Sequence, residues 1–229
     1  MSEPVTAIFF SCRRLDLLRQ TVSAFMKHNT YPISEYIIVN DSASNKVHNI
    51  LKSTYRNMTL VLNKDNVGLI KSIDLGYAHV KTNYLFHCED DWMVTKGGFM
   101  EKSLTIMEVC KDIEEVWLAD YNNHPVVPPI YYIGDVHYMY IKEYYLQGED
   151  KTNNNSWHGF TTALGLKRMS DYRKVAPYAD IPWKGTIWHR EQAIGERYHQ
   201  LGYRSAVLME DYAINIGYGQ SEYKTGYEK

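Results

Sequence analysis

The feature that most constrains the fold is a regular alternation of short apolar runs and longer segments with helical spacing, from residue 5 to residue 110. The run Val5–Ser11 is rich in β-branched and aromatic residues, which favours a buried strand. Four strand–helix pairs in succession predict a parallel sheet covered by helices. The expected strands are residues 5–11, 35–40, 58–62 and 83–88, and the expected helices are residues 15–28, 47–55, 67–80 and 97–110.

The carboxyl ends of these strands are where a ligand is expected, because open parallel sheets bind ligands beyond that edge. The rule brings together four segments that are far apart in the sequence, namely residues 11–14, 41–44, 63–68 and 89–92. Ser11 ends the first strand, and Arg13 and Arg14 follow it. The two arginines can meet a diphosphate, although surface solvation is expected for at least one of them.

The pattern changes after residue 115, where aromatic and polar stretches replace the regular alternation. Strands are expected at residues 115–119, 157–167 and 203–208, antiparallel strands at 131–145, a helix at 186–201, a proline-containing loop at 122–129 and a polar loop at 147–155. No internal repeat or low-complexity linker divides the sequence. The 229 residues are therefore expected to form one domain with a smaller antiparallel part in its second half.

Composition disfavours several classes of protein. Hydrophobic residues make up 45% of the chain, enough for a packed core, and a net charge of −2 argues against a nucleic-acid binder. The three cysteines show no metal-ligand spacing, which favours reduced thiols in the cytoplasm. The first apolar segment is far too short to cross a membrane, so no transmembrane segment is expected. The sequence contains no zinc motif, phosphate-binding P-loop or hydrolase nucleophile elbow.

Three consecutive acids, Glu89, Asp90 and Asp91, follow the apolar run at residues 83–88 and precede Trp92. Crowded carboxylates repel one another unless a cation or a proton neutralises them. Mg²⁺ and similar hard cations take oxygen ligands and commonly share one or two carboxylates with substrate phosphates. The cluster therefore favours metal-assisted binding of a phosphorylated ligand. The alternative is an N-terminal cap with an acidic first turn for a following helix.

Polar residues at two other strand ends are weaker candidates. Asp41 can accept a hydrogen bond from a base or ribose, or it can form an Asx turn or a helix cap, and the sequence leaves both open. Asn66 and Gly68 open the third helix, where glycine allows close backbone approach and the helix N-terminus attracts negative charge. Lys71, one turn into that helix, can reach a phosphate, although an ordinary turn explains the segment equally well.

The helix expected at residues 186–201 carries an acid on its apolar side. Its apolar stripe consists of Ile187, Ile194, Tyr198 and Leu201. Glu191 lies at the centre of this stripe, and an acid on an inward face should be paired or should face a cleft. Arg190 and Arg197 can neutralise it. Otherwise Glu191 is a general base whose pKa is adjusted by partial burial, and the residues leave both readings open.

Aromatic residues are frequent after residue 117, where they can line a sugar or peptide cleft or form core. Trp188 and His189 lie beside Glu191 and can position an acceptor, although a lone histidine is more often structural or exposed. Trp157 is assigned to the acceptor side as well. The segment 157–162 and Trp92 are the expected determinants of donor choice.

The chain resembles the inverting family-two glycosyltransferases, which have the glycosyltransferase-A fold, in the ordered motifs VNDSAS, NVGLIKSIDLGY, EDDW and REQAIGERYHQLGYR. The resemblance runs from Val5 to about Gly219. It implies an α/β fold with a Rossmann-like, mostly parallel central sheet flanked by helices, in a single domain over residues 1–229. Residues 1–120 would bind a nucleotide sugar, expected to be UDP-linked, and residues 121–229 would bind a glycan or glycoconjugate acceptor.

The resemblance also implies individual roles. Asp41 would contact the base, and Glu89 and Asp90 would contact ribose and sugar. Asp91 would bind Mn²⁺ or Mg²⁺ bridging the diphosphate, and Glu191 matches the catalytic base. Further donor contacts are assigned to Ser11, Arg13, Asn66, Gly68, Lys71 and Trp92.

One departure from the family concerns the metal. Related enzymes often have a histidine ligand in the loop after the last strand, and Asn215 stands at that position. An amide oxygen would be a weaker ligand, so a metal held mainly by Asp91 and the diphosphate is expected.

Two other classes of protein stay open. A nucleotidyltransferase that makes activated sugars also uses a parallel sheet and divalent ions, but FFSCRRLD lacks the glycines of its usual loop. A non-catalytic carbohydrate-binding module fits the 20 tyrosines, but it leaves the acidic cluster and Glu191 unexplained.

Overall fold

The computed structural model describes residues 2–118, 126–142, 144–145, 156–184 and 187–217. The first half contributes β1 (Val5–Ser11), α1 (Leu15–His28), β2 (Glu35–Asn40), α2 (Asn45–Thr54), β3 (Thr59–Leu62), α3 (Leu69–Tyr77), β4 (Tyr84–Glu89), β5 (Trp92–Val94), α4 (Phe99–Val109) and β6 (Ile113–Trp117). The second half contributes β7 (Val126–Ile133), β8 (Val136–Ile141), β9 (Tyr144–Tyr145), β10 (Ser156–Trp157), β11 (Leu164–Arg168), α5 (Met169–Val175), the 3₁₀ turn η1 (Tyr178–Asp180), α6 (Ile187–Gln200), β12 (Arg204–Leu208) and β13 (Ala213–Asn215). No helix in these ranges combines the length and the apolar character needed to span a bilayer.

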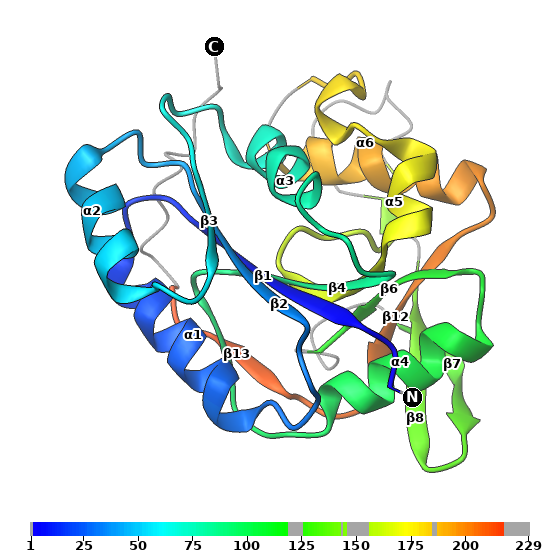
Figure 1. Cartoon of the computed structure of the whole chain (residues 1–229). Helices are drawn as coiled ribbons and strands as arrows, with labels where there is room; N and C mark the ends of the chain where they lie inside the picture. Colours follow the sequence, from blue (N-terminus) through cyan, green and yellow to red (C-terminus); the bar gives the residue numbers. More distant parts are fainter. Residues whose placement is uncertain (1, 119–125, 143, 146–155, 185–186, 218–229) are drawn as a thin grey trace.

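A nine-stranded sheet in the order β3-β2-β1-β4-β11-β6-β12-β8-β7 forms the centre of the molecule (Figure 1). The strands β3, β2, β1 and β4 are parallel, which confirms the sheet predicted for the first half. In the second half β11 runs antiparallel to both of its neighbours, and β7 and β8 form an antiparallel hairpin at the far edge. Because β11 is inserted between β4 and β6, the two halves of the chain share one sheet.

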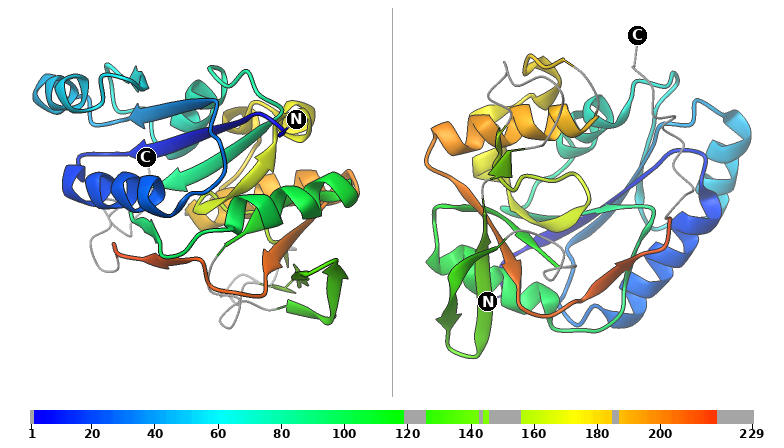
Figure 2. Two further views of the ribbon diagram at one scale, coloured as in Figure 1. Left: turned by 60° about the horizontal axis from the view of Figure 1, so that its bottom comes forward. Right: turned by 180° about the vertical axis from the view of Figure 1, so that it is seen from behind.

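Alternate residues of β1 belong to two separate hydrophobic cores. Phe9 packs in one core with Leu18 and Phe25 of α1 and with residues of α4. Ile8 packs in the other core with Ile73 of α3 and with residues of α5 and α6. The helices α1 and α4 therefore cover one face of the sheet, and α3, α5 and α6 cover the other (Figure 2). Because both faces are covered, β1 is buried along its length and is mostly apolar instead of alternating with exposed polar residues.

Helix α3 comes unusually close to the sheet at Gly76. A Cβ on Gly76 would lie 2.7 Å from Val39 Cγ2 and 2.8 Å from Ile8 Cδ1. A glycine is therefore needed for this approach to β1 and β2. The contact fixes α3, whose first residues lie at the carboxyl edge of the same strands (Figure 1).

Several predicted elements have limits that differ by a few residues in the structure, such as the strand expected at residues 115–119, which is β6 (Ile113–Trp117). At two elements a glycine explains the difference. The helix expected at residues 67–80 begins only after Gly68, which has a φ of 82° and serves as its N-cap. The single strand expected at residues 157–167 is wrong, because a loop at residues 158–163 separates β10 from β11. Gly159 has a φ of 92°, a left-handed conformation that ends the strand.

The segment around the second-half prolines is also corrected. Part of the loop expected at residues 122–129 is β7, which includes Pro128 and Pro129. Prolines are tolerated there because β7 is an edge strand, and its ladder with β8 shifts register across them. The polar loop expected at residues 147–155 lies outside the described residues. Four elements were not predicted, namely β5, β13, α5 and η1.

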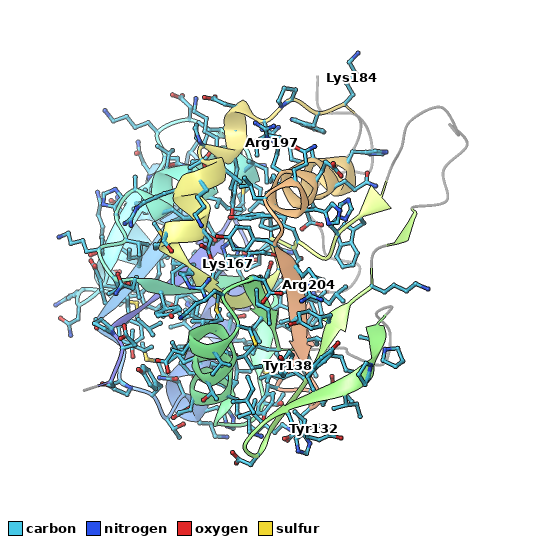
Figure 3. The ribbon with its side chains drawn as sticks, turned by 90° about the vertical axis from the view of Figure 1, so that its right-hand side faces the viewer. Tyr132, Tyr138, Lys167, Lys184, Arg197 and Arg204 are labelled. Carbon is cyan, nitrogen blue, oxygen red and sulfur yellow. The ribbon has the colours of Figure 1, made fainter. Side chains whose placement is uncertain are left out.

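Charged side chains are buried where β6 meets β11 and β12. Lys167 Nζ lies 2.5 Å from Glu115 Oε2, and Ser205 Oγ donates to Glu114 Oε1 at 2.6 Å. Figure 3 shows Lys167 inside the body of the molecule and Lys184 at its margin. Burial raises the pKa of Glu114 to about 7 and that of Glu115 to about 8, although Lys167 acts in the opposite direction on both.

The raised pKa of Glu114 predicts a pH-dependent stability. The pKa in the folded chain, about 7, exceeds the ordinary value of 4.5, so the folded state binds the proton more tightly. This contribution is complete below about pH 4.5 and is lost as the pH rises through about 7, with a limit of about 3 kcal/mol. Glu114→Gln, which can still accept from Ser205, should therefore lose less thermal stability than the wild type between pH 5 and pH 8. The matched control is Glu108→Gln on the exposed side of α4, and equal pH slopes in all three proteins would contradict the prediction.

Candidate functional site

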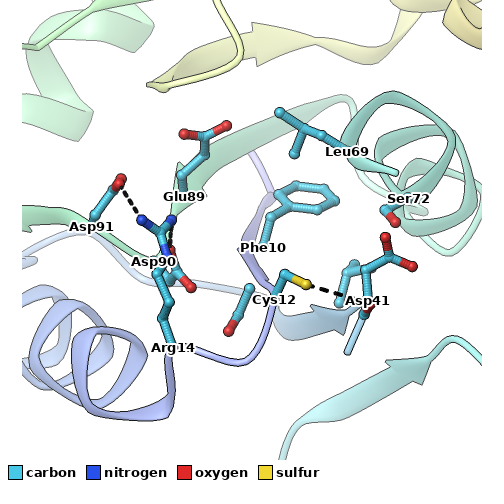
Figure 4. A pocket seen from close by; sticks show the side chains of 11 residues that line it. Phe10, Cys12, Arg14, Asp41, Leu69, Ser72, Glu89, Asp90 and Asp91 are labelled. Atoms are coloured by element: carbon cyan, nitrogen blue, oxygen red, sulfur yellow. Dashed lines mark hydrogen bonds and ion pairs between the residues drawn. The ribbon is translucent and has the colours of Figure 1, made fainter. Parts of the chain in front are cut away.

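A hollow opens at the carboxyl ends of β1, β2 and β4, beside the start of α3 (Figure 4). Its lining consists of Phe10, Ser11, Cys12, Arg14, Val39, Asp41, Leu69, Ser72, Glu89, Asp90 and Asp91. The lining thus brings together residues from three of the four segments that the strand-end rule collects, namely 11–14, 41–44 and 89–92. The geometry does not by itself test the roles assigned to them, which stay predictions.

Asp41 fixes the loop that leads into α3. Its Oδ1 accepts hydrogen bonds from Asn63 Nδ2 at 2.8 Å and Val67 N at 2.9 Å, and its Oδ2 accepts one from Gly68 N at 2.8 Å. Asn66 Nδ2 adds a bond of 2.7 Å to the Asp41 carbonyl. The carboxylate therefore anchors a loop that is distant in sequence, which differs from the Asx turn or helix cap predicted as the alternative, and its contact with a base stays a prediction. A carboxylate can accept about four hydrogen bonds, so one acceptor site is still open to a ligand.

Of the three basic residues predicted to meet phosphate, Arg13 and Lys71 are absent from the lining of this hollow, and Arg14 is part of it. Lys71 is exposed and lines a second hollow, together with Trp183 and Arg190. Arg13 is exposed and has a φ of 63°, a strained turn conformation for a non-glycine residue. Arg14 is the basic residue in the lining of the hollow at the strand ends, among the residues that the structure describes.

Arg14 forms ion pairs with two acids of the cluster (Figure 4). Its Nη1 donates to Asp91 Oδ2 at 2.9 Å, and its Nη2 donates to Asp90 Oδ1. Asp90 is fully buried, and Asp91 is 9% exposed. Burial raises the pKa of Asp90 to about 6, while Arg14 lowers it and Asp91 raises it further. Burial, followed by the charge of Asp91, also raises the pKa of Glu89.

The C-terminal segment of the described chain reaches the acidic cluster from the other side. Strand β13 pairs with β5, with Asn215 opposite Trp92, and Ile216 N donates to the Asp91 carbonyl at 2.8 Å. A Cβ on Gly217 would lie 2.4 Å from Asp91 Cβ, so a glycine is needed there. Asn215 therefore lies near Asp91, as predicted, although its Oδ1 accepts from Gly217 N at 2.9 Å. Trp92 packs half-buried against the core and is absent from the lining of the hollow.

The acidic cluster fits a divalent cation only in a particular way. The described residues contain no group of three or more His, Cys, Asp or Glu side chains arranged to hold a metal ion. However, Asp90 Oδ2 and Asp91 Oδ1 are buried and have no hydrogen-bond partner among the described residues. Mg²⁺ and related ions need only one or two carboxylates when phosphates and waters supply the other ligands. The side chains thus fit a cation bound jointly with a phosphorylated ligand.

Glu191 is buried, as its place in the apolar stripe predicts, but its partners differ from those expected. Its Oε1 accepts from Thr162 N at 2.7 Å, Thr162 Oγ1 at 2.8 Å and Thr161 Oγ1 at 3.3 Å. Arg197 is exposed, and Arg190 donates to a backbone carbonyl and stacks on a tryptophan ring. Burial raises the pKa of Glu191, and the bonds from Thr162 and Thr161 partly lower it.

The loop at residues 158–163, which contains Thr161 and Thr162, connects Glu191 to the acidic cluster at residues 89–91. Glu89 N donates to the Ala163 carbonyl at 3.0 Å, so the loop at residues 158–163 is bonded to the end of β4. The charge of Glu191 is one of the causes that raise the pKa of Glu89. Lys167 Nζ, from strand β11, donates to the Thr161 carbonyl at 3.0 Å and so ties the loop to the sheet. Glu191 is not in the lining of the hollow, but one short loop separates it from Glu89.

The residues predicted for the acceptor side have mixed outcomes. Trp157 is 4% exposed and packs edge-on against Trp117 in a third core. A ring packed in this way offers no face to a sugar, which removes Trp157 from the proposed acceptor surface. His189 is half-buried on α6, and the side chain of Trp188 lies outside the described part of the chain. Leu201 is 53% exposed beyond the end of α6, so its predicted place in the apolar stripe is wrong.

Comparison with known proteins identifies related sequences and structures. The sequence profile of glycosyl transferase family 2 matches residues 6–171. No curated protein matches the sequence. The solved structures with similar folds include S. aureus TarS 1–349 in complex with UDP, with 13% identity and a TM-score of 0.59 over 92% of this chain and 59% of that one.

Two other similar structures contain a metal ion. GalNAc-T7 with UDP, GalNAc and Mn²⁺ has 12% identity and a TM-score of 0.58 over 90% of this chain and 42% of that one. The mannosyltransferase PcManGT from Pyrobaculum calidifontis, in complex with GDP-Man and Mn²⁺, has 10% identity and a TM-score of 0.60 over 92% of this chain and 55% of that one. This chain therefore spans between 42% and 59% of the length of the three. At such identities the likeness shows the fold, which is the glycosyltransferase-A fold predicted from the sequence.

The three bonds accepted by the Asp41 carboxylate predict a stability effect. Asp41→Asn replaces one oxygen with a donor that faces backbone N–H groups, so at least one bond is lost and a donor is left buried. The variant should unfold at lower urea concentration, with a loss of about 2 kcal/mol. The control Asp65→Asn, in the exposed part of the same loop, should match the wild type. Equal unfolding midpoints for Asp41→Asn and the wild type would show that the anchor is dispensable.

Proposed function

Because the chain belongs to glycosyl transferase family 2, we propose that it transfers a sugar from a UDP-sugar to a hydroxyl of a glycan or glycoconjugate, with inversion at the anomeric carbon. The observation that carries the proposal is the convergence of Asp41, Asp90 and Asp91 on one hollow at the carboxyl edge of the sheet. The choice of UDP is supported by the UDP in the TarS and GalNAc-T7 structures, while the mannosyltransferase binds GDP-Man.

The nucleotide-sugar donor would bind residues at the edge of the hollow. Asp41 accepts a hydrogen bond from the base through its open acceptor site, and Glu89 and Asp90 contact ribose and sugar. Ser11 lines the same hollow and can donate to the donor. Asn66 and Gly68 act through Asp41, because both are bonded to it and hold the loop that encloses this end of the hollow.

The proposed cofactor is Mn²⁺ or Mg²⁺. Asp91, assisted by Asp90, would hold the ion with oxygens that have no other partner among the described residues, and Asn215 would contribute at most a weak ligand. When bound, the ion would offset negative charge on the departing nucleoside diphosphate. Metal use is supported by the Mn²⁺ in the GalNAc-T7 and mannosyltransferase structures.

Glu191 is the proposed general base. Its carboxylate would take the proton from the acceptor hydroxyl as that oxygen attacks the anomeric carbon on the face opposite the leaving group. A direct displacement of this kind inverts the anomeric centre. Burial makes the carboxylate a better proton acceptor, and Thr161 and Thr162 fix its orientation. The acceptor would lie over the start of α6, beside His189 and Trp188.

Incubation with a panel of nucleotide sugars tests the proposal against its alternatives. Slow release of UDP from a UDP-sugar, and transfer to an added glycan, supports the transferase. Release of pyrophosphate from a nucleoside triphosphate and a sugar phosphate would instead indicate a nucleotidyltransferase. Glycan binding without turnover of any donor would indicate a carbohydrate-binding module.

Substitution of the proposed base gives the first kinetic prediction. Glu191→Gln preserves the acceptor oxygen for the threonine bonds but cannot take a proton, so it should fold normally and lose turnover by about 10²- to 10⁴-fold. The matched control is Glu108→Gln, on the exposed side of α4, which should keep turnover within about twofold. Undiminished turnover in Glu191→Gln would remove this residue from the mechanism.

Substitution of the proposed metal ligand, Asp91, gives a prediction for the binding of UDP. Asp91→Asn removes the charge that would hold the ion, so the Mn²⁺-dependent part of UDP binding should disappear in calorimetry, while binding without Mn²⁺ is preserved. Asp135→Asn, in the exposed turn between β7 and β8, is the control for a general charge effect. Full Mn²⁺-dependent affinity in Asp91→Asn would contradict the assignment.

A further inference from the structure

We propose that Arg14 is a built-in counter-cation that competes with the divalent ion for Asp90 and Asp91, and that, once displaced, it binds the diphosphate of the donor. The inference rests on the proposed function. It goes beyond the diphosphate contact expected for Arg14 from the sequence, because it adds the competition between Arg14 and the cation. It would make the binding of cation and the binding of diphosphate mutually dependent through one side chain.

Arg14 binds the same two carboxylates that a cation would need, through one oxygen of each. The other oxygens, Asp91 Oδ1 and Asp90 Oδ2, would hold the cation, so the cation and the guanidinium would compete for the charge of the same pair. One N–H of the guanidinium binds Asp91 and another binds Asp90, so both acids share a single partner. The side chains of Arg14, Asp90 and Asp91 are only 17%, 1% and 12% exposed. Two adjacent buried carboxylates would repel each other strongly without this charge. A divalent ion would therefore replace an existing neutralising group instead of filling an uncompensated site.

The backbone of Arg14 is fixed by hydrogen bonds, so its displacement would involve the side chain alone. Arg14 is the N-cap of α1, its N donates to the Cys12 carbonyl at 2.8 Å, and its carbonyl accepts from Leu18 N at 3.0 Å. The left-handed turn at Arg13 sets the direction from which the chain enters the helix. Displacement thus requires only rotation about side-chain bonds, with no change in the fold.

A displaced guanidinium of Arg14 could bind the donor diphosphate within the same hollow. Arg14 lines the same hollow as Asp41 and Glu89, at the edge where the diphosphate of the donor would lie (Figure 4). A divalent ion on Asp91 would repel the guanidinium, and a diphosphate would attract it. The planar, forked N–H groups of arginine suit phosphate oxygens as well as carboxylates. Arg14 can therefore exchange one anion for the other within the hollow.

Binding of Mn²⁺ alone to the full chain, measured by calorimetry, tests the competition. Arg14→Met should bind Mn²⁺ roughly tenfold more tightly than the wild type, because charge-assisted bonds to both acids are removed. Arg13→Met loses the same charge one residue earlier in an exposed side chain and should differ from the wild type by at most about twofold. An Arg14→Met affinity equal to or weaker than that of the wild type, or matched by Arg13→Met, would overturn the proposal.

Binding of inorganic pyrophosphate tests the exchange. At saturating Mn²⁺, Arg14→Met should bind pyrophosphate roughly tenfold more weakly than the wild type, so the same variant gains affinity for one ligand and loses it for the other. Equal pyrophosphate affinity would overturn the exchange. Arg14→Lys retains the charge without the fork and should give intermediate values, which serves if Arg14→Met does not fold. The donor panel uses wild-type protein and tests the proposed function separately, so failure of one does not imply failure of the other.

Discussion

The neutralisation of Asp90 and Asp91 is the interaction on which the rest of the site depends. Two neighbouring carboxylates at the end of a buried strand are unfavourable unless a positive charge compensates them. Arg14 supplies that charge in the structure, from the loop between β1 and α1. The parallel order of β1 and β4 makes the pairing possible, because it brings the two strand ends to the same edge. The proposed cation-binding site and its proposed internal competitor would thus arise from the same topology.

The antiparallel insertion of β11 explains how a helix from the second half reaches this edge. Strand β11 follows the loop at residues 158–163, and this loop is bonded to Glu89 on one side and to Glu191 on the other. Lys167 and Glu115 hold the base of the loop with a buried ion pair. The proposed base and the proposed metal ligand are therefore positioned by adjacent strands of one sheet. Their separation is set by the fold and not by a mobile connection.

The local hydrophobic pattern of the sequence was sufficient to predict the strands and helices of the first half. The features that it did not predict are determined by contacts between residues far apart in the sequence. The limits of β1 and β2 follow from apolar runs, and the limits of α1 follow from the helical spacing of its apolar residues. The strand-end rule predicted Asp41, Asp90 and Asp91 in one hollow. The partners of Glu191 were wrong, because Thr161 and Thr162 lie about 30 residues away in sequence. The adjacent arginines, by contrast, point elsewhere.

The sequence also could not predict which of Arg13 and Arg14 faces the acidic cluster. Both residues follow β1 and have the same chemistry, and the left-handed conformation that separates them has no sequence signal in a non-glycine residue. The interruption of the strand predicted at residues 157–167 is comparable. Gly159 is the only local indication of it, and the loop is fixed by bonds to Glu115, Lys167 and Glu191. Residues held by distant partners need the fold before they can be assigned.

The central claim is that the acidic edge and Glu191 act on one bound donor. An anomalous diffraction map at the manganese absorption edge, from crystals containing Mn²⁺, UDP and a non-transferable sugar analogue, tests it most directly. We expect one strong peak beside Asp91, with the diphosphate between the ion and Arg14 and the anomeric carbon facing Glu191. A peak away from Asp91, or a sugar bound on the far side of β4 from Glu191, would contradict it.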